Sequence, residues 1–310
     1  MSGEIREPLV SIILNCYNGE KYLKDALDSV YSQIYKNWEI IFWDNQSTDN
    51  SENIAKSYDS RIYYHRSTEH TNLGKARNLA INLAKGKYIA FIDCDDIWLP
   101  NKLSEQVEMM EMNPRFILSY AGVEEIFLNG KKFRDVPTIY QSGFIFNKLL
   151  KQFDIPILTT IINNELLQEN KILFDPLITA SEEYCLFMQL ACVNEIGVSE
   201  KILAKYRVHS NSLTSNSISK LSFERRYTLN KIMQNHPNIY IKYQDEFKEA
   251  FARANYYDSR FHMMNSNKFK AFESLKPVAF INVRYFILTI LTLTSLKLWN
   301  WVHFKFRNRA

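Results

Sequence analysis

The chain has 310 residues, of which 46% are hydrophobic and 14% aromatic. That composition excludes disorder as the main state and provides a core for about two domains of roughly 150 residues each. The 8 glycines never form a G-x-G or G-x-x-x-x-G-K pattern. Their spacing therefore counts against a Rossmann dinucleotide-binding turn and against a P-loop.

Charge is distributed unevenly along the chain, although its net value is only +4. No Asp or Glu follows Glu273, whereas six basic residues do. The rest of the chain is slightly acidic, which argues against nucleic-acid binding and predicts an anionic partner for the C-terminal tail.

The four cysteines predict neither a disulfide framework nor a zinc site, because they include no C-x-x-C pair and no Cys/His quartet. A reducing compartment fits this pattern best. The first residues lack the apolar stretch of a signal peptide. We therefore expect the protein to act in the cytoplasm.

Short β-branched runs alternate with helical patterns in the first hundred residues. Strands are expected at 10–14, 40–43, 61–65 and 88–92, and helices at 22–31, 51–58 and 74–84 with Ala76, Leu79, Ala80 and Leu83 inward. This alternation predicts an α/β fold with a largely parallel sheet and helices on both faces. Ligands of such sheets collect at the carboxyl ends of the strands, so functional side chains should follow Leu14, Trp43 and Ile92.

Beyond residue 100 the pattern predicts that the sheet becomes mixed. Pro100 favours a helix start, with Leu99 as the cap residue, and Asn129-Gly130 favours a hairpin turn. Further elements are expected as a helix at 101–112, strands from 116 and at 157–162 and 202–208, a helix at 182–193, a polar linker at 210–220 and helices at 221–275.

Three carboxylates, Asp93, Asp95 and Asp96, directly follow the expected strand at 88–92. Like charges this close raise each other's pKa unless a cation lies among them. Mg²⁺ and Mn²⁺ take oxygen ligands and share their shell with substrate phosphates, so this cluster suits a metal-diphosphate site. The alternative is a solvated loop that leads into the next helix.

Two further side chains follow neighbouring strands of the expected sheet. Asp44 closes the strand at 40–43, and Tyr17 follows the strand at 10–14. A carboxylate there can accept a hydrogen bond from a base N–H, and an aromatic ring offers a stacking face. The alternatives are an Asx-turn for Asp44 and packing at the core edge for Tyr17.

Taken together, these segments resemble family 2 glycosyltransferases over about residues 9–105. The resemblance rests on VSIILNCYN at 10–18, LDSV at 27–30, EIIFWD at 39–44, GKARN at 74–78 and AKGKYIAFIDCDD at 84–96. It implies a GT-A fold with a mixed sheet flanked by helices, a nucleotide-sugar donor that is usually a UDP-sugar, a divalent metal ion (Mn²⁺ or Mg²⁺) and transfer with inversion. One departure is Asn15, where the family commonly has Pro.

By the same resemblance, Asp44 would bind the uracil ring and Tyr17 would stack near it. Asp93 would lie against the ribose and the metal shell, and Asp95 would ligate the metal. The family usually places a Glu-Asp pair at the start of a late helix, where this chain has Glu182 and Glu183. Glu183 would therefore be the general base, one methylene longer than the usual Asp.

The structural alternative for Glu182 and Glu183 is charge complementarity to a helix N-terminus, with Ser181 as its cap. A Tyr-Arg-x-His element late in the family's sheet also resembles residues 206–209. His209 would complete the metal shell and Arg207 would face the diphosphate. Arg77 and Asn78 are further candidates for donor contacts, with a solvated helix face as the alternative for the cation.

The expected organisation is a catalytic domain at 1–213, a helical region at 214–276 and an apolar, basic tail at 277–310. The longest uncharged run of the tail, residues 285–296, is shorter than the roughly 20 residues of a membrane span. We therefore expect the tail to bind the anionic inner face of the cell membrane without crossing it. A helix packed on the protein and a tilted single span are the alternatives.

The function implied is hexosyl transfer to a hydroxyl of a glycan acceptor, carried on a lipid, in bacterial surface polysaccharide or glycoconjugate biosynthesis. Two other classes remain open. One is a sugar nucleotidyltransferase, although no Gly-rich, Arg-containing loop follows the first strand. The other is a binding protein for nucleotide sugars or glycans that lacks catalysis. Hydrolysis of a donor distinguishes all three.

Overall fold

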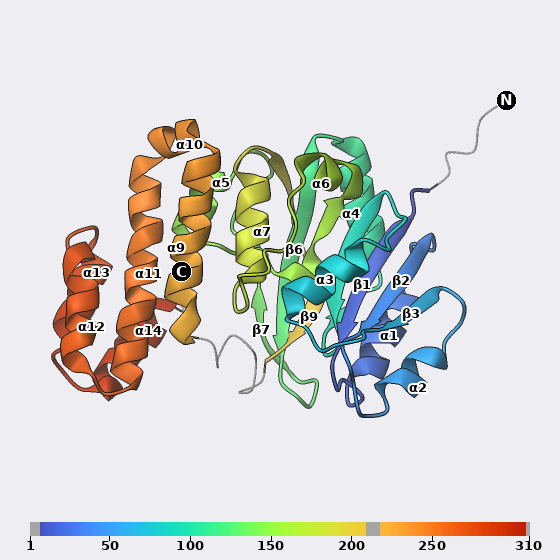
Figure 1. Ribbon diagram of the computed structural model, residues 1–310, viewed down its shortest axis with the longest axis horizontal. Coiled ribbons are helices and arrows are strands. Elements are labelled where there is room, and N and C mark those ends of the chain that lie inside the picture. Colours follow the sequence, from blue (N-terminus) through green and yellow to red (C-terminus); the bar gives the residue numbers. More distant parts are fainter. Residues whose placement is uncertain (1–6, 209–217, 308–310) are drawn as a thin grey trace. The chain divides into compact units, whose positions relative to one another are not determined.

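The computed structural model describes residues 7–208 and 218–307 (Figure 1). The chain forms two compact units. One consists of Met1–Phe146 and Phe153–Ser210, and the other of Asn147–Gln152 and Asn211–Ala310. The first unit contains the sheet, and the second is helical.

The sheet of the first unit has the strand order β3-β2-β1-β4-β8-β6-β9-β5, with β7 paired to β6. The strands are β1 (Val10–Cys16), β2 (Trp38–Asp44), β3 (Ile62–Arg66), β4 (Tyr88–Asp93), β5 (Ile97–Trp98), β6 (Phe116–Ile126), β7 (Lys132–Val136), β8 (Ile161–Asn163) and β9 (Glu195–Arg207). The block β3-β2-β1-β4 is parallel, whereas β8 is antiparallel to both β4 and β6. The predicted mixed sheet is therefore confirmed.

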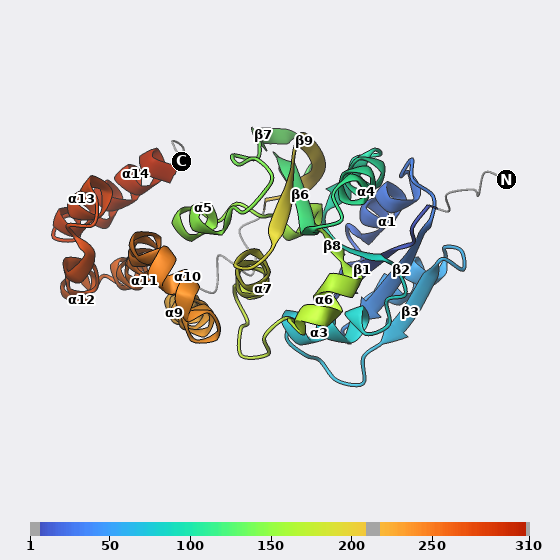
Figure 2. The ribbon, with the colours of Figure 1, turned by 90° about the horizontal axis from the view of Figure 1, so that it is seen from above.

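Helices cover both faces of the sheet, as Figure 2 shows with α1 and α4 on one side of β1 and α3 on the other. The helices of this unit are α1 (Leu23–Tyr31), α2 (Ser51–Lys56), α3 (Leu73–Ile81), α4 (Lys102–Met112), α6 (Asn164–Asn170) and α7 (Glu182–Ala191). Alternate residues of β1, namely Val10, Ile12 and Leu14, pack in one core with α1 and α4. A strand buried on both faces is what the continuous apolar run predicts.

The direction in which successive strands are added to the sheet reverses between β3 and β4. It runs from β1 outward to β2 and β3, and then returns to pair β4 with the other edge of β1. Open α/β sheets bind ligands at the carboxyl ends of the strands beside such a switch point. Those ends are Cys16 in β1 and Asp93 in β4.

Several expected boundaries were wrong in detail. The stretch at 157–162 is a single 3₁₀ turn (Ile157–Thr159) followed by the short β8, because an apolar run of this length suits either structure. Helix α4 has Asn101 as its cap position, two residues after Leu99. Leu83 is exposed, because α3 ends at Ile81 before that residue can turn inward.

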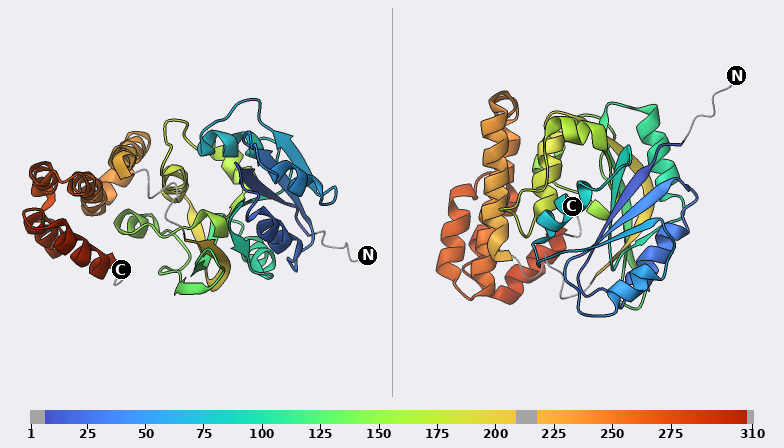
Figure 3. Two further views of the ribbon diagram at one scale, coloured as in Figure 1. Left: turned by 90° about the horizontal axis from the view of Figure 1, so that it is seen from below. Right: turned by 45° about the vertical axis from the view of Figure 1, so that its right-hand side comes forward.

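The second unit contains only helices among the residues that the structure describes. These α-helices are α9 (Ile218–Asn235), α10 (Pro237–Lys242), α11 (Gln244–Met264), α12 (Lys268–Leu275), α13 (Val283–Leu291) and α14 (Leu296–Arg307). Helix α5 (Phe146–Lys151) also belongs to this unit, except for its first residue. Helices α9 and α11 run side by side (Figure 3). The fully buried Trp299 of α14 stacks on Tyr256 of α11, with 5.8 Å between the ring centroids. None of the described helices has the length and apolar character needed to cross a membrane.

Candidate active site

The side chains expected at the strand ends do come together in the first unit. Cys16 pairs in register with Asp44, and Asn15 pairs with Asp93. Because β1 lies between β2 and β4, the segments that follow these three strands emerge side by side. Tyr17, Asp44 and Asp93 therefore belong to one edge of the sheet.

The loops after β1 and β2 are tied together by hydrogen bonds. The Asn18 backbone N–H donates to Ser47 Oγ (3.0 Å), and Asn18 Oδ1 accepts from the Thr48 backbone N–H (2.8 Å). Asn18 and Gln46 adopt the left-handed backbone region, with φ of 52° and 74°. Such conformations cost free energy and persist only where surrounding contacts fix them, so this end of the site is preorganised.

An exposed aromatic ring stands at the end of β1. Tyr17 is 53% exposed, and its ring lies 4.4 Å from that of His70, centroid to centroid. His70 Nδ1 lies 2.9 Å from the Asn45 carbonyl oxygen, which anchors the imidazole. Sequence reasoning missed His70, because it stands in a loop without a motif.

Asp44 is buried at the end of β2. One of its carboxylate oxygens accepts the Ser47 backbone N–H (2.6 Å), and the other accepts the hydroxyl of Tyr64 (2.6 Å). Arg66 Nη1 lies 3.6 Å from the second oxygen. The carboxylate of Asp44 thus accepts from the backbone three residues on, one residue farther than in the Asx-turn expected as the alternative. Recognition of a base by Asp44 stays a prediction.

The segment Asp93–Asp96, the carboxylate turn, contains three carboxylates in two kinds of surroundings. Asp96 is buried, and its Oδ1 accepts the backbone N–H of Arg207 (3.2 Å). Burial, followed by the charges of Asp95 and Asp93, raises the pKa of Asp96 well above its usual range. Asp93 and Asp95 are partly exposed. Of the three carboxylates, only Asp93 and Asp95 are thus accessible to solvent.

Arg207, at the end of β9, fastens the carboxylate turn to α1. Its Nε donates to the Asp95 carbonyl oxygen (2.8 Å), and its Nη2 pairs with Asp25 (2.7 Å). The guanidinium also lies over the ring of Tyr22, 4.4 Å from the centroid. Contact of Arg207 with a diphosphate stays a prediction, and His209 lies outside the described residues.

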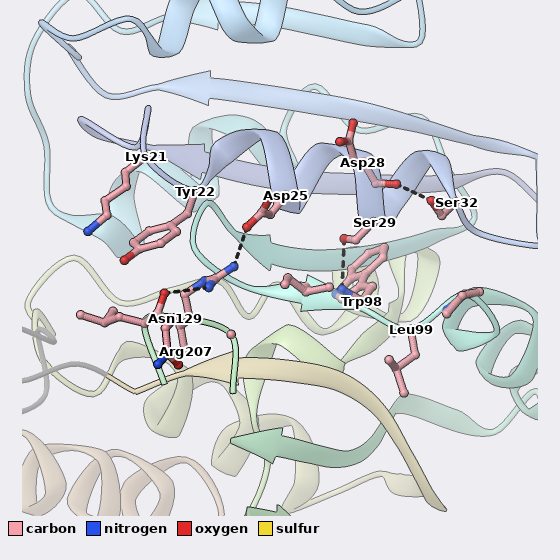
Figure 4. A pocket seen from close by; sticks show the side chains of 14 residues that line it. Lys21, Tyr22, Asp25, Asp28, Ser29, Ser32, Trp98, Leu99, Asn129 and Arg207 are labelled. Carbon is pink, nitrogen blue, oxygen red and sulfur yellow. Dashed lines mark hydrogen bonds and ion pairs between the residues drawn. The ribbon is translucent and has the colours of Figure 1, made fainter. Parts of the chain in front are cut away.

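A pocket of about 710 Å³ opens beside this guanidinium, between α1 and the β6–β7 hairpin (Figure 4). Figure 4 shows Arg207 pointing toward Asp25 at this pocket. The pocket is lined by Lys21, Tyr22, Asp25, Asp28, Ser29, Ser32, Ile97, Trp98, Leu99, Pro100, Leu128, Asn129, Gly130 and Arg207. The same arginine thus borders both the pocket and the carboxylate turn.

Arg77 joins the carboxylate turn to the start of α7. Its side chain is 3% exposed, and its two terminal nitrogens donate to Asp93 Oδ1 (3.0 Å) and to Glu182 Oε1 (2.9 Å). The neighbouring Asn78 holds both the N–H and the carbonyl of Phe174. Direct contacts of Arg77 and Asn78 with a donor stay predictions, since the structure shows both engaged within the protein.

The two glutamates at the start of α7 differ in their surroundings. Glu182 is buried and paired with Arg77, whereas Glu183 remains partly exposed. Burial, followed by the charge of Glu182, raises the pKa of Glu183 to about 8, while the charge of Arg77 opposes the shift. A carboxyl with a pKa near neutrality is suited to exchange a proton with substrate.

The oxygen atoms of Asp93 and Asp95 fit a hard divalent cation. Mg²⁺ is usually held by one or two carboxylates and completes its shell with water and substrate phosphates. Two accessible carboxylates at a strand end supply that minimum. No group of three or more His, Cys, Asp or Glu side chains among the described residues could by itself hold a metal ion.

Residues 11–167 match the family described as "Glycosyl transferase family 2". The chain belongs to this family. It is therefore a family 2 glycosyltransferase, as the motifs predicted.

Named relatives of this glycosyltransferase come from several bacteria. It is 34% identical over 218 residues to the "UDP-Glc:alpha-D-GlcNAc-diphosphoundecaprenol beta-1,3-glucosyltransferase WfgD" of Escherichia coli, which covers 69% of this chain and 82% of the relative. It is also 34% identical over 219 residues to the "Putative teichuronic acid biosynthesis glycosyltransferase TuaG" of Bacillus subtilis (68% and 83%). An uncharacterized glycosyltransferase of Rickettsia felis is 34% identical over 221 residues, and that match spans 70% of this chain but only 36% of the relative.

Solved structures establish the fold. S. aureus TarS 1-349 in complex with UDP superposes with a TM-score of 0.67 at 17% identity, covering 97% of this chain and 92% of TarS. The mannosyltransferase PcManGT from Pyrobaculum calidifontis, solved with GDP-Man and Mn²⁺, gives a TM-score of 0.60 at 14% identity (96% and 84%). This glycosyltransferase thus has the predicted GT-A fold, followed by a helical C-terminal region.

Proposed function

We propose that this glycosyltransferase transfers a sugar, with inversion, from a UDP-sugar to a hydroxyl of a lipid-linked glycan during surface polysaccharide synthesis. One observation carries the proposal. Arg77 binds Asp93 in the carboxylate turn and Glu182 at the start of α7, next to Glu183. The proposed metal-diphosphate end of the site and the proposed base are thereby fixed to each other through one buried side chain.

The donor half of the proposal rests on the end of β1. The exposed ring of Tyr17, beside His70, offers a stacking face for a nucleobase, and the adjoining loops are held in place by hydrogen bonds. WfgD is named for a UDP-glucose donor and a diphosphoundecaprenol-linked acceptor. For this chain, both are proposals by similarity.

The proposed reaction is a single displacement at the anomeric carbon. Glu183 takes the proton of the acceptor hydroxyl as that oxygen attacks, and Glu182 with Arg77 fixes the start of α7. Asp93 and Asp95 would hold the divalent ion, which supplies charge stabilisation for the leaving nucleoside diphosphate. A serine or cysteine nucleophile is not needed.

Asp95→Ala is expected to abolish metal-dependent donor hydrolysis in a panel of UDP-sugars with Mn²⁺ or Mg²⁺. The side chain is partly exposed, so the free energy of unfolding should change by no more than about 1 kcal/mol. UDP release is the measurement, and Asp245→Ala, at an exposed carboxylate of α11, is the control.

Full turnover by Asp95→Ala, or by the wild type in excess EDTA, would contradict the metal-dependent site. Tight UDP-sugar binding without any hydrolysis would instead favour a binding protein. Release of a sugar phosphate and a nucleoside triphosphate, in the presence of pyrophosphate, would favour a nucleotidyltransferase.

The tail carries an exposed apolar surface that suits a membrane. We name the following side chains the tail surface: Phe280, Val283, Phe286, Ile290, Leu293, Leu298 and Trp301. Phe280 is 89% exposed and Leu293 is 62% exposed, whereas Leu288 and Trp299 are buried within their own unit. The segment after Glu273 also lacks any acidic residue. We propose that the tail surface inserts into the interface of an anionic membrane while the buried side packs on α11 and α12.

Substitution of Phe280, Val283 and Leu293 by Ser is expected to lower flotation with anionic liposomes by at least tenfold. These three side chains contribute little to the core, so the protein should remain folded, whereas a truncation would remove the buried Trp299. The control replaces three exposed apolar residues of the first unit, Met112, Phe144 and Leu177, by Ser. Equal flotation of both variants and the wild type would contradict membrane binding by the tail surface.

A further inference from the structure

Two thiols meet where β1 adjoins the carboxylate turn. Cys16 ends β1 and is buried, while Cys94 follows Asp93 in the carboxylate turn and is partly exposed. Both side chains pack on the same side of the sheet. Asn15 pairs with Asp93 across the parallel strands, so Cys16 and Cys94 are the next residues in that register.

The two sulfur atoms both lie next to Gly19. A Cβ added at Gly19 would lie 2.8 Å from Cys16 Sγ and 2.8 Å from Cys94 Sγ, so both sulfurs stand beside the same point. Neighbouring strands are about 4.8 Å apart, which lies within the Cα separation of about 4.4–6.8 Å that disulfides span.

The other two cysteines provide an internal comparison. Cys185 is buried in α7, and Cys192 is the buried residue that caps the C-terminus of that helix. The Cys192 thiol donates to the Gln189 carbonyl. Seven residues of helix separate them by about 10 Å, beyond the reach of a disulfide. None of the four cysteines, all of which lie among the described residues, is in a disulfide.

We propose that Cys16 and Cys94 are a reversible disulfide site, closed by a two-electron oxidant of the peroxide class. One of the two thiols attacks the peroxide, and the O–O bond breaks to give a sulfenic acid and one water. The other sulfur then attacks the sulfenic sulfur, which forms the S–S bond and releases a second water. Two thiols and one peroxide thus give one disulfide and two waters, and an external dithiol reverses the reaction by exchange.

Closure would act on the carboxylate turn, because Asp93 and Asp95 flank Cys94. Bonding the sulfurs to about 2.05 Å draws this segment toward β1 and restricts both carboxylates. We therefore expect oxidation to lower donor hydrolysis at least tenfold, and dithiothreitol to restore it. This part of the inference rests on the proposed function.

The test treats the folded full chain with hydrogen peroxide, blocks remaining thiols with N-ethylmaleimide and maps the unreduced peptides by mass spectrometry. The expected result is loss of two thiols and one linked peptide pair that contains Cys16 and Cys94. Cys16→Ser and Cys94→Ser should each lack the linked pair, and a Cys185→Ser, Cys192→Ser double variant should keep it. Having two single variants keeps the test valid if one of them fails to fold.

Oxidation of Cys94 to a sulfinic acid without a linked pair, or a pair that includes Cys185 or Cys192, would overturn the inference. A Cys16–Cys94 link with unchanged donor hydrolysis would overturn the effect on the carboxylate turn. Absence of hydrolysis in the reduced protein would contradict the proposed function alone, because the peptide map does not depend on catalysis.

Discussion

Glu183→Gln is expected to lower turnover by about 10²- to 10⁴-fold, the usual contribution of a general base. The amide keeps the size of the side chain but cannot accept the acceptor's proton, so donor affinity should change little. Glu182→Gln should cost at least tenfold less turnover, because Glu182 is paired with Arg77 and is not the proposed base. Turnover and donor affinity of the two variants are the measurements.

The pH dependence of the wild type follows from the raised pKa of Glu183, about 8. Glu183 accepts a proton only when ionised, so turnover should rise with pH and level off above that value. The turnover of Glu183→Gln should not show this rise with pH. A larger loss of turnover in Glu182→Gln than in Glu183→Gln would contradict the assignment of the base. A rise of turnover with pH that persists in Glu183→Gln would assign the titration to another group.

The pH dependence of protein stability tests the raised pKa of Glu183 independently of turnover. Its pKa is near 4.5 in the unfolded chain and about 8 in the folded protein. Between these values the folded state binds one more proton than the unfolded state, so this group's contribution to stability is lost as pH rises. Glu183→Gln should therefore be more stable than the wild type at pH 9, and by a larger margin than at pH 5.

Arg77→Met is expected to reduce the free energy of unfolding by about 3–5 kcal/mol, the usual result of removing one partner of a buried ion pair. Arg77 is buried between Asp93 and the buried Glu182, so its loss leaves Glu182 as an uncompensated charge. Turnover should fall as well, because the carboxylate turn loses its connection to α7. Denaturant unfolding measures the first effect.

Lys75→Met is the matched control, since Lys75 lies on the same helix but pairs with Glu69 at the surface. Exposed pairs contribute about 0–1 kcal/mol, so this variant should be nearly as stable as the wild type. Arg77→Lys keeps one charge but cannot bridge both carboxylates in the same geometry, and should fall between the two. Equal stability of Arg77→Met and Lys75→Met would contradict the bridging role.

Local patterns predicted most of the first unit. Short, β-branched apolar runs predicted the strands between residues 10 and 92, and the helical pattern at 22–31 predicted α1, whose buried residues include Leu23, Ala26, Leu27 and Val30. The prediction was weaker where an apolar run is short, as at 157–162, because such a run does not distinguish a strand from a helical turn. The fold beyond the sheet's parallel block depends on contacts that periodicity does not encode.

The sequence predicted only those site residues whose positions follow from the ends of neighbouring strands. Tyr17, Asp44 and Asp93 lie together because parallel strands end at one edge. The pairing of Arg77 with Glu182 joins residues 105 positions apart, and that of Arg207 with Asp25 joins residues 182 apart. Nothing local in the sequence determines such pairs, so neither pairing was predicted, and contact of the two arginines with a donor stays a prediction.

The configuration of the first released sugar tests the central claim most directly. The metal-loaded wild type would be mixed with a UDP-sugar whose sugar is α-linked, and proton NMR would follow its slow hydrolysis before the anomers equilibrate. A single displacement assisted by Glu183 predicts that the β-anomer appears first. Initial release of the α-anomer would contradict inversion and, with it, the role proposed for Glu183.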